Sequence, residues 1–289
     1  MKITQLLQRT VGAGTCMLLL LGTAGGAVAE ETSSQQQLSE PVYRVPRDEN
    51  QATVQPQEHP LAPALRMAQQ GLTSIDEGIR DYSCTLVKRE RIDGALSEPA
   101  YIFTKVRHEP FSVYMYFLGP QDVKGRECIY VADQNEGQLI AHEGGGVIGR
   151  LGTFHLDPQG RLAMRGQRYP ITEVGIRNLT NRLIEVAEHD MKFGECEVKF
   201  FKGAKIDGRS ATCIQVTHPT PRKEFRFHMA RIYVDDELQI PIRYEAYQWP
   251  SAPGGKPVLD EEYTYVNMKV NNGFTDADFD ESNQNYQFK

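Results

Sequence analysis

The chain has 289 residues, of which 40% are hydrophobic, 24% charged and 9% aromatic. This composition is close to that of ordinary globular proteins, and it excludes a collagen-like chain, a chain disordered throughout and a multi-spanning membrane protein. The formal net charge is −6, and it would be −8 without the basic Lys2 and Arg9 of the leader described next, which argues against a nucleic-acid-binding protein.

The first 29 residues are typical of a cleaved secretory signal peptide. Residues 1–9 carry two basic side chains, residues 10–29 are uncharged, and the segment ends in Ala27-Val28-Ala29. A basic start, an apolar middle and a small-residue end predict cleavage before Glu30 and export to the periplasm or the outside of the cell. The alternative, an uncleaved membrane anchor, is disfavoured because five glycines dilute the hydrophobicity, so we expect no transmembrane span after cleavage.

Residues 30–60 are predicted to form a disordered tether. They contain six Gln, four Pro and five Glu but almost no large apolar side chain. Too little apolar surface is available to offset the entropy of ordering such a segment. Apolar residues return at Leu61 and no second break of this kind follows, so residues 61–289 are expected to form a single β-rich domain.

The elements of this domain follow in chain order from the spacing of apolar residues. Helical spacing over residues 61–80 predicts an amphipathic helix, after which the period changes to two and predicts strands. A second helix is expected to start near Thr172, its N-cap, and to end near Asp190. The expected strands are 82–92, 100–108, 112–118, 126–132, 137–142 and 151–157 before the second helix, and 196–201, 211–218, 225–234, 240–247 and 258–270 after it.

These elements predict a mainly β (α+β) fold. The connections between strands are too short for helical crossovers, so the sheet should be antiparallel. About eleven strands would form a curved antiparallel sheet or an unclosed β-barrel, whose inner face the N-terminal helix and the one inserted helix can cover. Strand 112–118 is apolar on both faces, with Tyr114 and Tyr116 on one of them. A helix, a second layer or a bound apolar ligand could cover such a strand, and the periodicity leaves all three open.

The resemblance of this domain to a known family is carried by six segments. They are 81–94 (DYSCTLVKRERIDG), 105–120 (KVRHEPFSVYMYFLGP), 125–131 (GRECIYV), 162–176 (LAMRGQRYPITEVGI), 240–250 (IPIRYEAYQWP) and 260–280 (DEEYTYVNMKVNNGFTDADFD). Together they resemble a family of secreted bacterial domains that is known only as a domain of unknown function. The resemblance covers nearly all of residues 61–289, and it implies neither an activity nor catalytic residues.

A second, more remote resemblance concerns architecture. A helix, a long antiparallel sheet and an inserted helix resemble the LolA-type lipoprotein carriers. Those proteins have an unclosed β-barrel whose concave apolar face holds acyl chains under a helical lid. The resemblance implies a LolA-like fold for residues 61–289, but it assigns no residue a function, because fold alone is weak evidence of function.

Candidate catalytic motifs fail in their structural context. Gly144-x-Gly146-x-x-Gly149 has the spacing of a dinucleotide fingerprint, but it joins two predicted strands where that fingerprint needs a following helix. Residues 208–212 resemble a serine-hydrolase elbow without its last glycine. Glu261 and Glu262 are adjacent, so they point to opposite faces of a strand and make a poor catalytic pair. We therefore expect no enzyme, no catalytic residue and no cofactor.

Metal-binding motifs are incomplete as well. Asp276, Asp278 and Asp280 alternate as in a calcium loop, but Glu281 stands where such a loop needs glycine. The favoured interpretation is that Thr275 caps a short turn together with Asp278. We therefore expect no metal site.

Four cysteines remain after the predicted cleavage: Cys84, Cys128, Cys196 and Cys213. An even number in an exported chain permits disulfides. Cys196 and Cys213 would face each other in a hairpin that turns at residues 204–205, but not in one that turns at Asp207-Gly208, which is the stronger turn signal. A Cys196–Cys213 disulfide and four buried thiols are both left open.

Charged side chains within apolar strands are the candidate ligand contacts. Arg243 alternates with apolar residues in strand 240–247, and Glu261 precedes Tyr263 in strand 258–270. If these strands pair, Arg–Glu ion pairs along one face would form a structural ladder. The functional alternative makes Arg243 and Glu261 polar anchors at the mouth of an apolar groove. The candidate ligand-binding residues are Tyr114, Tyr116, Arg243, Tyr244, Glu261 and Tyr263.

The leading hypothesis is an exported, non-enzymatic cell-envelope protein that binds a lipid, an acyl chain or a lipid-modified protein on the concave face of a curved sheet. The alternative is a structural or protein-interaction module of the envelope without a small ligand, to which the tether gives reach. The first hypothesis predicts an apolar cavity, whereas the second predicts a packed interior and an exposed edge or apolar patch. An enzyme acting on a polysaccharide or an ester is the third possibility.

Overall fold

The computed structural model describes residues 58–144, 152–252 and 254–288. The predicted signal peptide, nearly all of the predicted tether, and Gly146 and Gly149 of the glycine motif lie outside these residues. No helix in the described ranges combines the length and the apolarity needed to cross a bilayer.

Twelve strands of the described residues form one sheet, in the mainly β architecture expected from the sequence. The strands are β1 (Asp81–Ile92), β2 (Ala95–Leu96), β3 (Ala100–Arg107), β4 (Ser112–Gly119), β5 (Glu127–Val131), β6 (Leu139–His142), β7 (Thr153–Leu156), β8 (Glu197–Ile206), β9 (Arg209–Thr217), β10 (Met229–Asp235), β11 (Pro241–Gln248) and β12 (Val258–Val270).

The strand order shows how two halves of the chain make a single sheet. Neighbours pair in the order β7-β6-β5-β4-β3-β1-β12-β11-β10-β9-β8, and each pair is antiparallel. Strands β1 to β7 form one meander and β8 to β12 the other, and β12 returns to pair with β1 at the centre. The sheet is unclosed, with β7 and β8 at its two edges in the described part of the chain.

The sequence predicts about eleven strands, and the described residues form these eleven and one more. All eleven expected strands are present, and the additional strand is β2, which pairs with the end of β1. Asp93 and Gly94 turn the chain between them with positive φ angles of 49° and 82°. A pairing of two residues is too short to produce a hydrophobic period, which is why the spacing did not predict it.

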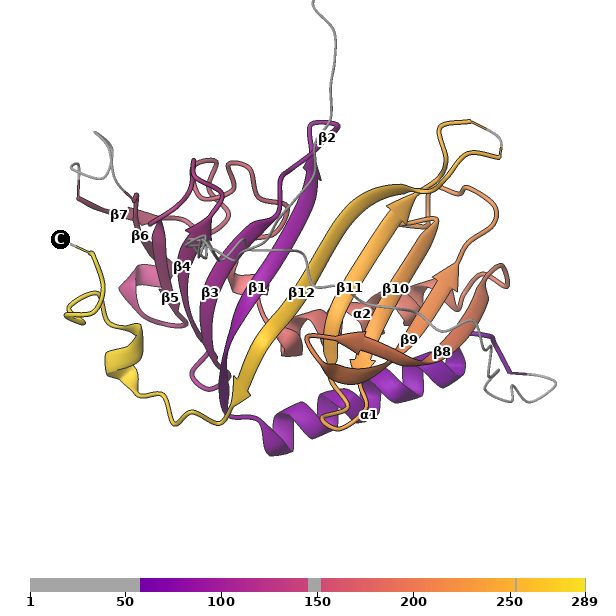
Figure 1. Ribbon diagram of the computed structural model, residues 1–289, viewed down its shortest axis with the longest axis horizontal. Helices are drawn as coiled ribbons and strands as arrows, with labels where there is room; N and C mark the ends of the chain where they lie inside the picture. The colour runs from indigo at the N-terminus through magenta and orange to yellow at the C-terminus, as the bar shows by residue number, and fades with distance from the viewer. Residues whose placement is uncertain (1–57, 145–151, 253, 289) are drawn as a thin grey trace, which may run out of the picture. The chain divides into compact units, whose positions relative to one another are not determined.

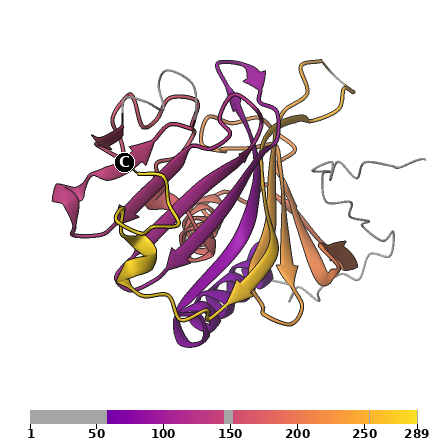
Figure 2. The same cartoon turned by 60° about the vertical axis from the view of Figure 1, so that its left-hand side comes forward.

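Two helices lie on the concave side of the sheet, which curves around them (Figure 1, Figure 2). They are α1 (Ala62–Gly78) and α2 (Ile176–Asp190). On α1, Gly71 permits a close approach to the sheet, because a Cβ at this position would lie 2.7 Å from the carbonyl oxygen of Gln239 in the β10–β11 turn. The backbone of α1 therefore packs directly against that turn.

The predicted N-cap of the second helix is wrong. Thr172 belongs to a separate 3₁₀ turn (η3, Ile171–Glu173), and α2 begins after Gly175, which has a φ of 112°. The hydroxyl of the fully buried Tyr82 accepts a hydrogen bond from the Ile176 N–H at 3.0 Å. A side chain 94 positions away thus satisfies one of the unpaired N–H groups of the first turn, and no local pattern reports it.

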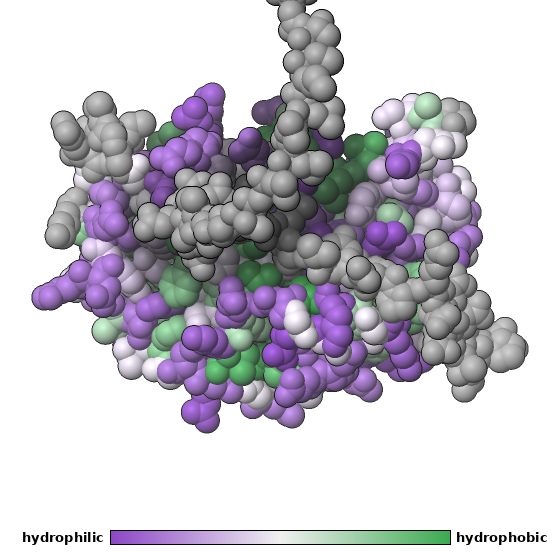
Figure 3. All heavy atoms as spheres, viewed as in Figure 1, coloured by the Kyte–Doolittle hydropathy of each residue, from purple (hydrophilic) through white to green (hydrophobic). Residues whose placement is uncertain are grey.

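The outer face of the sheet is covered in part by the C-terminal segment, residues 271–288. Tyr286 stacks on Tyr114 of β4 with ring centroids 4.0 Å apart, and Phe279 and Phe288 are buried nearby. The part of the outer side visible in Figure 3 carries interspersed polar and apolar side chains. The C-terminal segment is therefore a packed part of the domain.

The C-terminal segment is attached at its start by a buried carboxylate, and it contains the predicted cap. Asp81 accepts hydrogen bonds from the backbone N–H groups of Asn272 and Gly273 at 2.6 and 3.0 Å. Further on, Thr275 and Asp278 form a capping box at the short helix η4 (Asp276–Phe279), which confirms that interpretation of the aspartate-rich sequence.

The Cys196–Cys213 disulfide, one of the two alternatives that the sequence leaves open, is not formed. The β8–β9 hairpin turns at Asp207-Gly208, and this register places Cys213 opposite Phe201. Cys196 precedes β8, and all four cysteines of the described residues are present as thiols. The register that places the two cysteines apart is the one set by the stronger turn signal.

Candidate functional site

A large cavity lies between the concave face of the sheet and the two helices. Its volume is about 1310 Å³, which exceeds the roughly 300–1,000 Å³ of ordinary small-molecule pockets. Its wall is mostly apolar and is built from both helices and from both halves of the sheet. Representative apolar residues of the wall are Leu65 on α1, Leu183 on α2, Met115 and Phe117 on β4, and Ile214 and Val216 on β9.

The alternation of side chains along each strand determines which residues reach the cavity. On β12, Glu261, Tyr263 and Tyr265 line the cavity, whereas Glu262 and Thr264 contact Arg243 on the other face of the sheet. The same period of two brings Leu86, Lys88 and Glu90 of β1 into the wall of the cavity. The inner face therefore carries charges at positions that are otherwise apolar.

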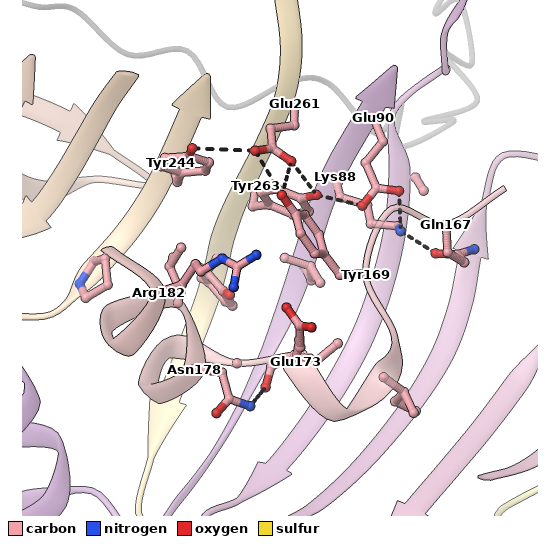
Figure 4. Close-up of a pocket in the computed structure, with 18 of the residues that line it drawn as sticks. Lys88, Glu90, Gln167, Tyr169, Glu173, Asn178, Arg182, Tyr244, Glu261 and Tyr263 are labelled. Carbon is pink, nitrogen blue, oxygen red and sulfur yellow. Dashed lines mark hydrogen bonds and ion pairs between the residues drawn. The ribbon is translucent and has the colours of Figure 1, made fainter. Parts of the chain in front are cut away.

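These charges meet in one group at the wall, which we call the polar cluster (Figure 4). Glu261 accepts a hydrogen bond from the Tyr169 hydroxyl at 2.8 Å and pairs with the Arg168 guanidinium at 3.1 Å. Glu90 accepts hydrogen bonds from the Tyr263 hydroxyl at 2.6 Å and from the Lys88 ammonium at 3.0 Å. The polar cluster comprises Lys88, Glu90, Arg168, Tyr169, Glu261 and Tyr263.

Burial sets the protonation preferences in the polar cluster. It raises the pKa of Glu261 above the usual glutamate value, against the lowering effects of Arg168 and of the Tyr169 hydrogen bond. Burial, together with the charge of Glu261, also raises the pKa values of Tyr169 and Tyr263. The two phenols therefore remain protonated near neutral pH and act as hydrogen-bond donors to the carboxylates.

Arg168 and Tyr169 lie in the long connection between β7 and α2, in a turn just before η3. The Arg168 N–H donates to Glu90 at 3.2 Å, and the Arg168 guanidinium also pairs with Asp260 at 2.7 Å. The turn is thereby held against both β1 and β12. This connection places a polar segment across the wall of an otherwise apolar cavity.

The sequence model of a family described as "Protein of unknown function (DUF1571)" matches residues 79–288. The chain belongs to the DUF1571 family. The match spans β1 to the C-terminal segment, and it confirms the family of unknown function expected from the six sequence segments. No curated protein matches the chain.

Solved structures similar to this DUF1571 chain include the three that follow. A LolA superfamily protein from Nitrosomonas europaea aligns with 12% identity and a TM-score of 0.31 over 74% of this chain and 97% of its own. The Mycobacterium tuberculosis lipoprotein LppX aligns with 14% identity and a TM-score of 0.39 over 73% and 98%. A chain of the Pseudomonas aeruginosa MucA/MucB complex aligns with 16% identity and a TM-score of 0.40 over 74% of this chain and 60% of its own. At this level of similarity, no ligand or partner is transferred to the DUF1571 chain.

Three of the six candidate ligand-binding residues line the cavity of this DUF1571 chain: Tyr244, Glu261 and Tyr263. Tyr244 and Tyr263 are register partners on β11 and β12, with their rings stacked at 6.4 Å between centroids. The Tyr244 hydroxyl lies 3.5 Å from Glu261. These three residues border one region of the wall, as Figure 4 shows.

The other three candidates, Tyr114, Tyr116 and Arg243, do not line the cavity. Tyr114 and Tyr116 pack on the outer face with the aromatic residues of the C-terminal segment. Arg243 donates to Glu245 at 2.8 Å and pairs with Glu262 at 2.5 Å, on the outer face as well. The ladder of ion pairs is thus present on the outer face. Its acid opposite Arg243 is Glu262, whereas Glu261 lies on the cavity side.

Sequence reasoning missed several members of the polar cluster. Lys88 and Glu90 gave the same signal that identified Glu261, because they are charged residues on the same strand face as the apolar Leu86 and Ile92. Arg168 and Tyr169 gave no such signal, because they lie in a turn without periodic side-chain spacing. Only the folded structure places that turn against the sheet.

Within the described ranges, no group of three or more histidine, cysteine or acidic side chains is arranged to hold a metal ion. The thiol that lines the cavity, Cys128, has its pKa raised to about 12 by burial. It is therefore a protonated wall residue, since the thiolate is the nucleophilic form of cysteine.

Proposed function

We propose that this protein is an exported, non-enzymatic cell-envelope protein that binds a lipid or an acyl chain in the cavity between the sheet and its two helices. The observation that carries the proposal is the cavity itself, which has a mostly apolar wall and a volume of about 1310 Å³. A domain stabilised only by its own packing would fill such a space with side chains, because protein interiors are close-packed.

The energetics favour an alkyl chain as the occupant. Each methylene group transferred from water to an apolar wall contributes about 0.8 kcal/mol. About ten buried methylenes would therefore supply roughly 8 kcal/mol, before the costs of immobilising the ligand are subtracted. Long-chain amphiphiles bring this number of methylenes in one molecule, whereas small polar metabolites do not.

The chemistry of the wall supports binding over catalysis. The charged groups of the polar cluster are paired with each other, Lys88 with Glu90 and Arg168 with Glu261, and the phenols donate to the same carboxylates. Paired charges of this kind satisfy buried groups and fix the cavity wall. Export rests on the secretory leader predicted from the sequence.

The deciding experiment is organic extraction and mass spectrometry of the protein purified from its own envelope without detergent. A stoichiometric lipid or acylated peptide is the expected result. Protein that is empty, and that stays empty when offered a fluorescent fatty acid, would overturn the proposal in favour of an interaction module. Cross-linking in the envelope would then be the way to identify its partner.

A further inference from the structure

One arginine at the edge of the polar cluster, Arg226, makes a single side-chain hydrogen bond within the described residues, to the Tyr169 hydroxyl. We propose that the ligand of the cavity carries an anionic group, a carboxylate or a phosphate, and that the Arg226 guanidinium binds it. The inference rests on the proposed lipid-binding function and adds the chemical class of the ligand's polar end.

The backbone on both sides of Arg226 is held in place. Phe225 and Phe227 are each only 5% exposed, and the Gln248 side-chain amide donates to the Arg226 carbonyl at 3.2 Å. The Arg226 side chain lines the cavity, as does Phe227. A guanidinium is therefore presented from a fixed backbone beside an apolar wall, which suits an amphiphile with a charged end.

The contacts of Arg226 leave room for a ligand. Nη2 donates to the Tyr169 hydroxyl, and the guanidinium carbon lies 5.4 Å from the centroid of the Tyr169 ring. Within the described ranges no carboxylate is at ion-pair distance from Arg226. A guanidinium has five N–H donors in a planar fork, and that fork matches the two oxygens of a carboxylate or phosphate.

Other cations on the cavity wall are less suited to this role. Arg165 is exposed, so water screens its charge. The remaining ones have carboxylate partners in the described chain. These pairs are Lys88–Glu90 at 3.0 Å, Arg126–Glu143 at 3.0 Å and Arg182–Glu185 at 3.5 Å.

Four acids border the proposed anion site. Glu185, Asp190 and Glu224 line a small pocket together with Arg226. Glu261 is linked to Arg226 through hydrogen bonds, because the Tyr169 hydroxyl that accepts from Arg226 donates to Glu261. The ion pair with Arg168 at 3.1 Å offsets its charge. Burial also favours the protonated form of Glu261, so proton uptake there can accompany binding of an anion. The titratable and charged groups on the sheet side of this point are Lys88, Glu90, Arg168, Tyr169, Tyr244, Asp260, Glu261 and Tyr263. On the side of α2 and of the Arg226 segment they are Arg182, Glu185, His189, Asp190 and Glu224.

The test uses ligand pairs that differ only in the anionic group. The affinity of the delipidated protein for cis-parinaric acid is compared with that for its methyl ester by fluorescence titration. A second pair, dipalmitoyl phosphatidic acid and dipalmitoylglycerol, is measured by competition and distinguishes a phosphate from a carboxylate. We expect the wild-type protein to bind the anionic member of at least one pair about tenfold more tightly, which corresponds to about 1.4 kcal/mol.

In the variant Arg226→Gln, the affinity for the anionic member of a pair should fall to that for the neutral member. The affinity for the neutral member should stay unchanged. Arg222→Gln is the matched control, because Arg222 is exposed on the same segment and pairs with Glu195 at 2.6 Å. Should Arg226→Gln fail to fold, Arg226→Lys keeps the charge without the planar fork, and a partial loss of the preference is expected.

Equal wild-type affinity for the charged and neutral members of both pairs would overturn the anion site and leave the proposed lipid-binding function standing. A preference that persists in Arg226→Gln would overturn the role of Arg226. Failure to bind any of the four ligands would overturn the proposed function, and the anion site with it.

Discussion

Glu261 and Glu262 are neighbours on β12, yet their side chains lie on opposite faces of the sheet and have unrelated surroundings. Glu261 lines the cavity, where it accepts from Tyr169 and pairs with Arg168. Glu262 pairs with Arg243 at 2.5 Å on the outer face. The alternation of a strand thus divides two adjacent carboxylates between a candidate binding site and a structural ion-pair ladder.

Filling the cavity should abolish ligand binding without unfolding the protein. Ala68 lines the cavity from α1, so Ala68→Trp places an indole in the space proposed for an alkyl chain. We expect its affinity for cis-parinaric acid to fall at least about tenfold. Gln69→Trp is the control, because Gln69 is exposed on the same helix and should bind as the wild-type protein does. Unchanged affinity in Ala68→Trp would contradict the placement of the ligand in this cavity.

Breaking the outer ladder should cost stability and leave binding intact. Arg243 is 6% exposed and donates to Glu245, which is fully buried, and to Glu262. Arg243→Ala would leave two buried carboxylates without this partner, which typically costs about 3–5 kcal/mol of unfolding free energy. Urea unfolding measures the loss. A normal affinity for cis-parinaric acid in the folded variant would confirm that Arg243 acts outside the binding site.

A surface ion pair is the matched comparison for Arg243. Arg177 pairs with Asp76 at 2.6 Å, and its side chain is 45% exposed. Solvent screens a pair of this kind, so Arg177→Ala should leave the urea midpoint close to that of the wild-type protein. If Arg177→Ala and Arg243→Ala lowered the midpoint equally, burial of the ladder would not be the source of its contribution.

The sheet was predictable from sequence because its signal is local. The period of two identified eleven strands, and it also placed Glu261 and Glu262 on opposite faces. What escaped prediction depends on contacts between distant residues. The Tyr82 hydroxyl accepts a hydrogen bond from the backbone N–H of Ile176 at the start of α2. Tyr286 of the C-terminal segment stacks on Tyr114. The sequence shows that β4 is apolar on both faces, but not that the C-terminal segment of the same chain covers one of these faces.

The candidate site was predictable only in the part carried by strands. Glu261 was found because a charged group stands out within an apolar strand. Arg168 and Tyr169 sit in a turn, and their approach to Glu261 depends on how that turn folds back onto the sheet. Arg226 was visible as a charge beside Phe227, but the absence of a carboxylate partner in the described chain is a property of the fold.

The raised pKa of Glu261 predicts a pH-dependent contribution to stability. Its folded-state pKa lies above the ordinary value of 4.5, so the folded protein retains this proton at pH values at which the unfolded chain has released it. The contribution of Glu261 to the unfolding free energy therefore decreases as the pH rises from about 4.5 through the raised pKa. Glu261→Gln lacks this titration.

Urea unfolding at a series of pH values tests that sign. The stability of Glu261→Gln relative to the wild-type protein should increase with pH above the ordinary glutamate value and become constant above the raised pKa. A difference that is the same from about pH 4 to 7 would show that the pKa of Glu261 does not change on folding. A difference that decreases over this range would mean that Arg168 and Arg226 outweigh burial.

The close contact of α1 with the β10–β11 turn predicts opposite results for two glycines of the same helix. A Cβ at Gly71 would lie 2.7 Å from the Gln239 carbonyl oxygen, a backbone atom that cannot move without shifting the turn. Gly71→Ala should therefore destabilise the domain by about 1–3 kcal/mol, as overpacking does. At Gly78 a Cβ would meet nothing within 4 Å, so Gly78→Ala should be neutral or stabilising. If Gly71→Ala were as stable as Gly78→Ala in urea unfolding, α1 would not pack against the β10–β11 turn at this distance. The position of α1 in the cavity wall would then be wrong.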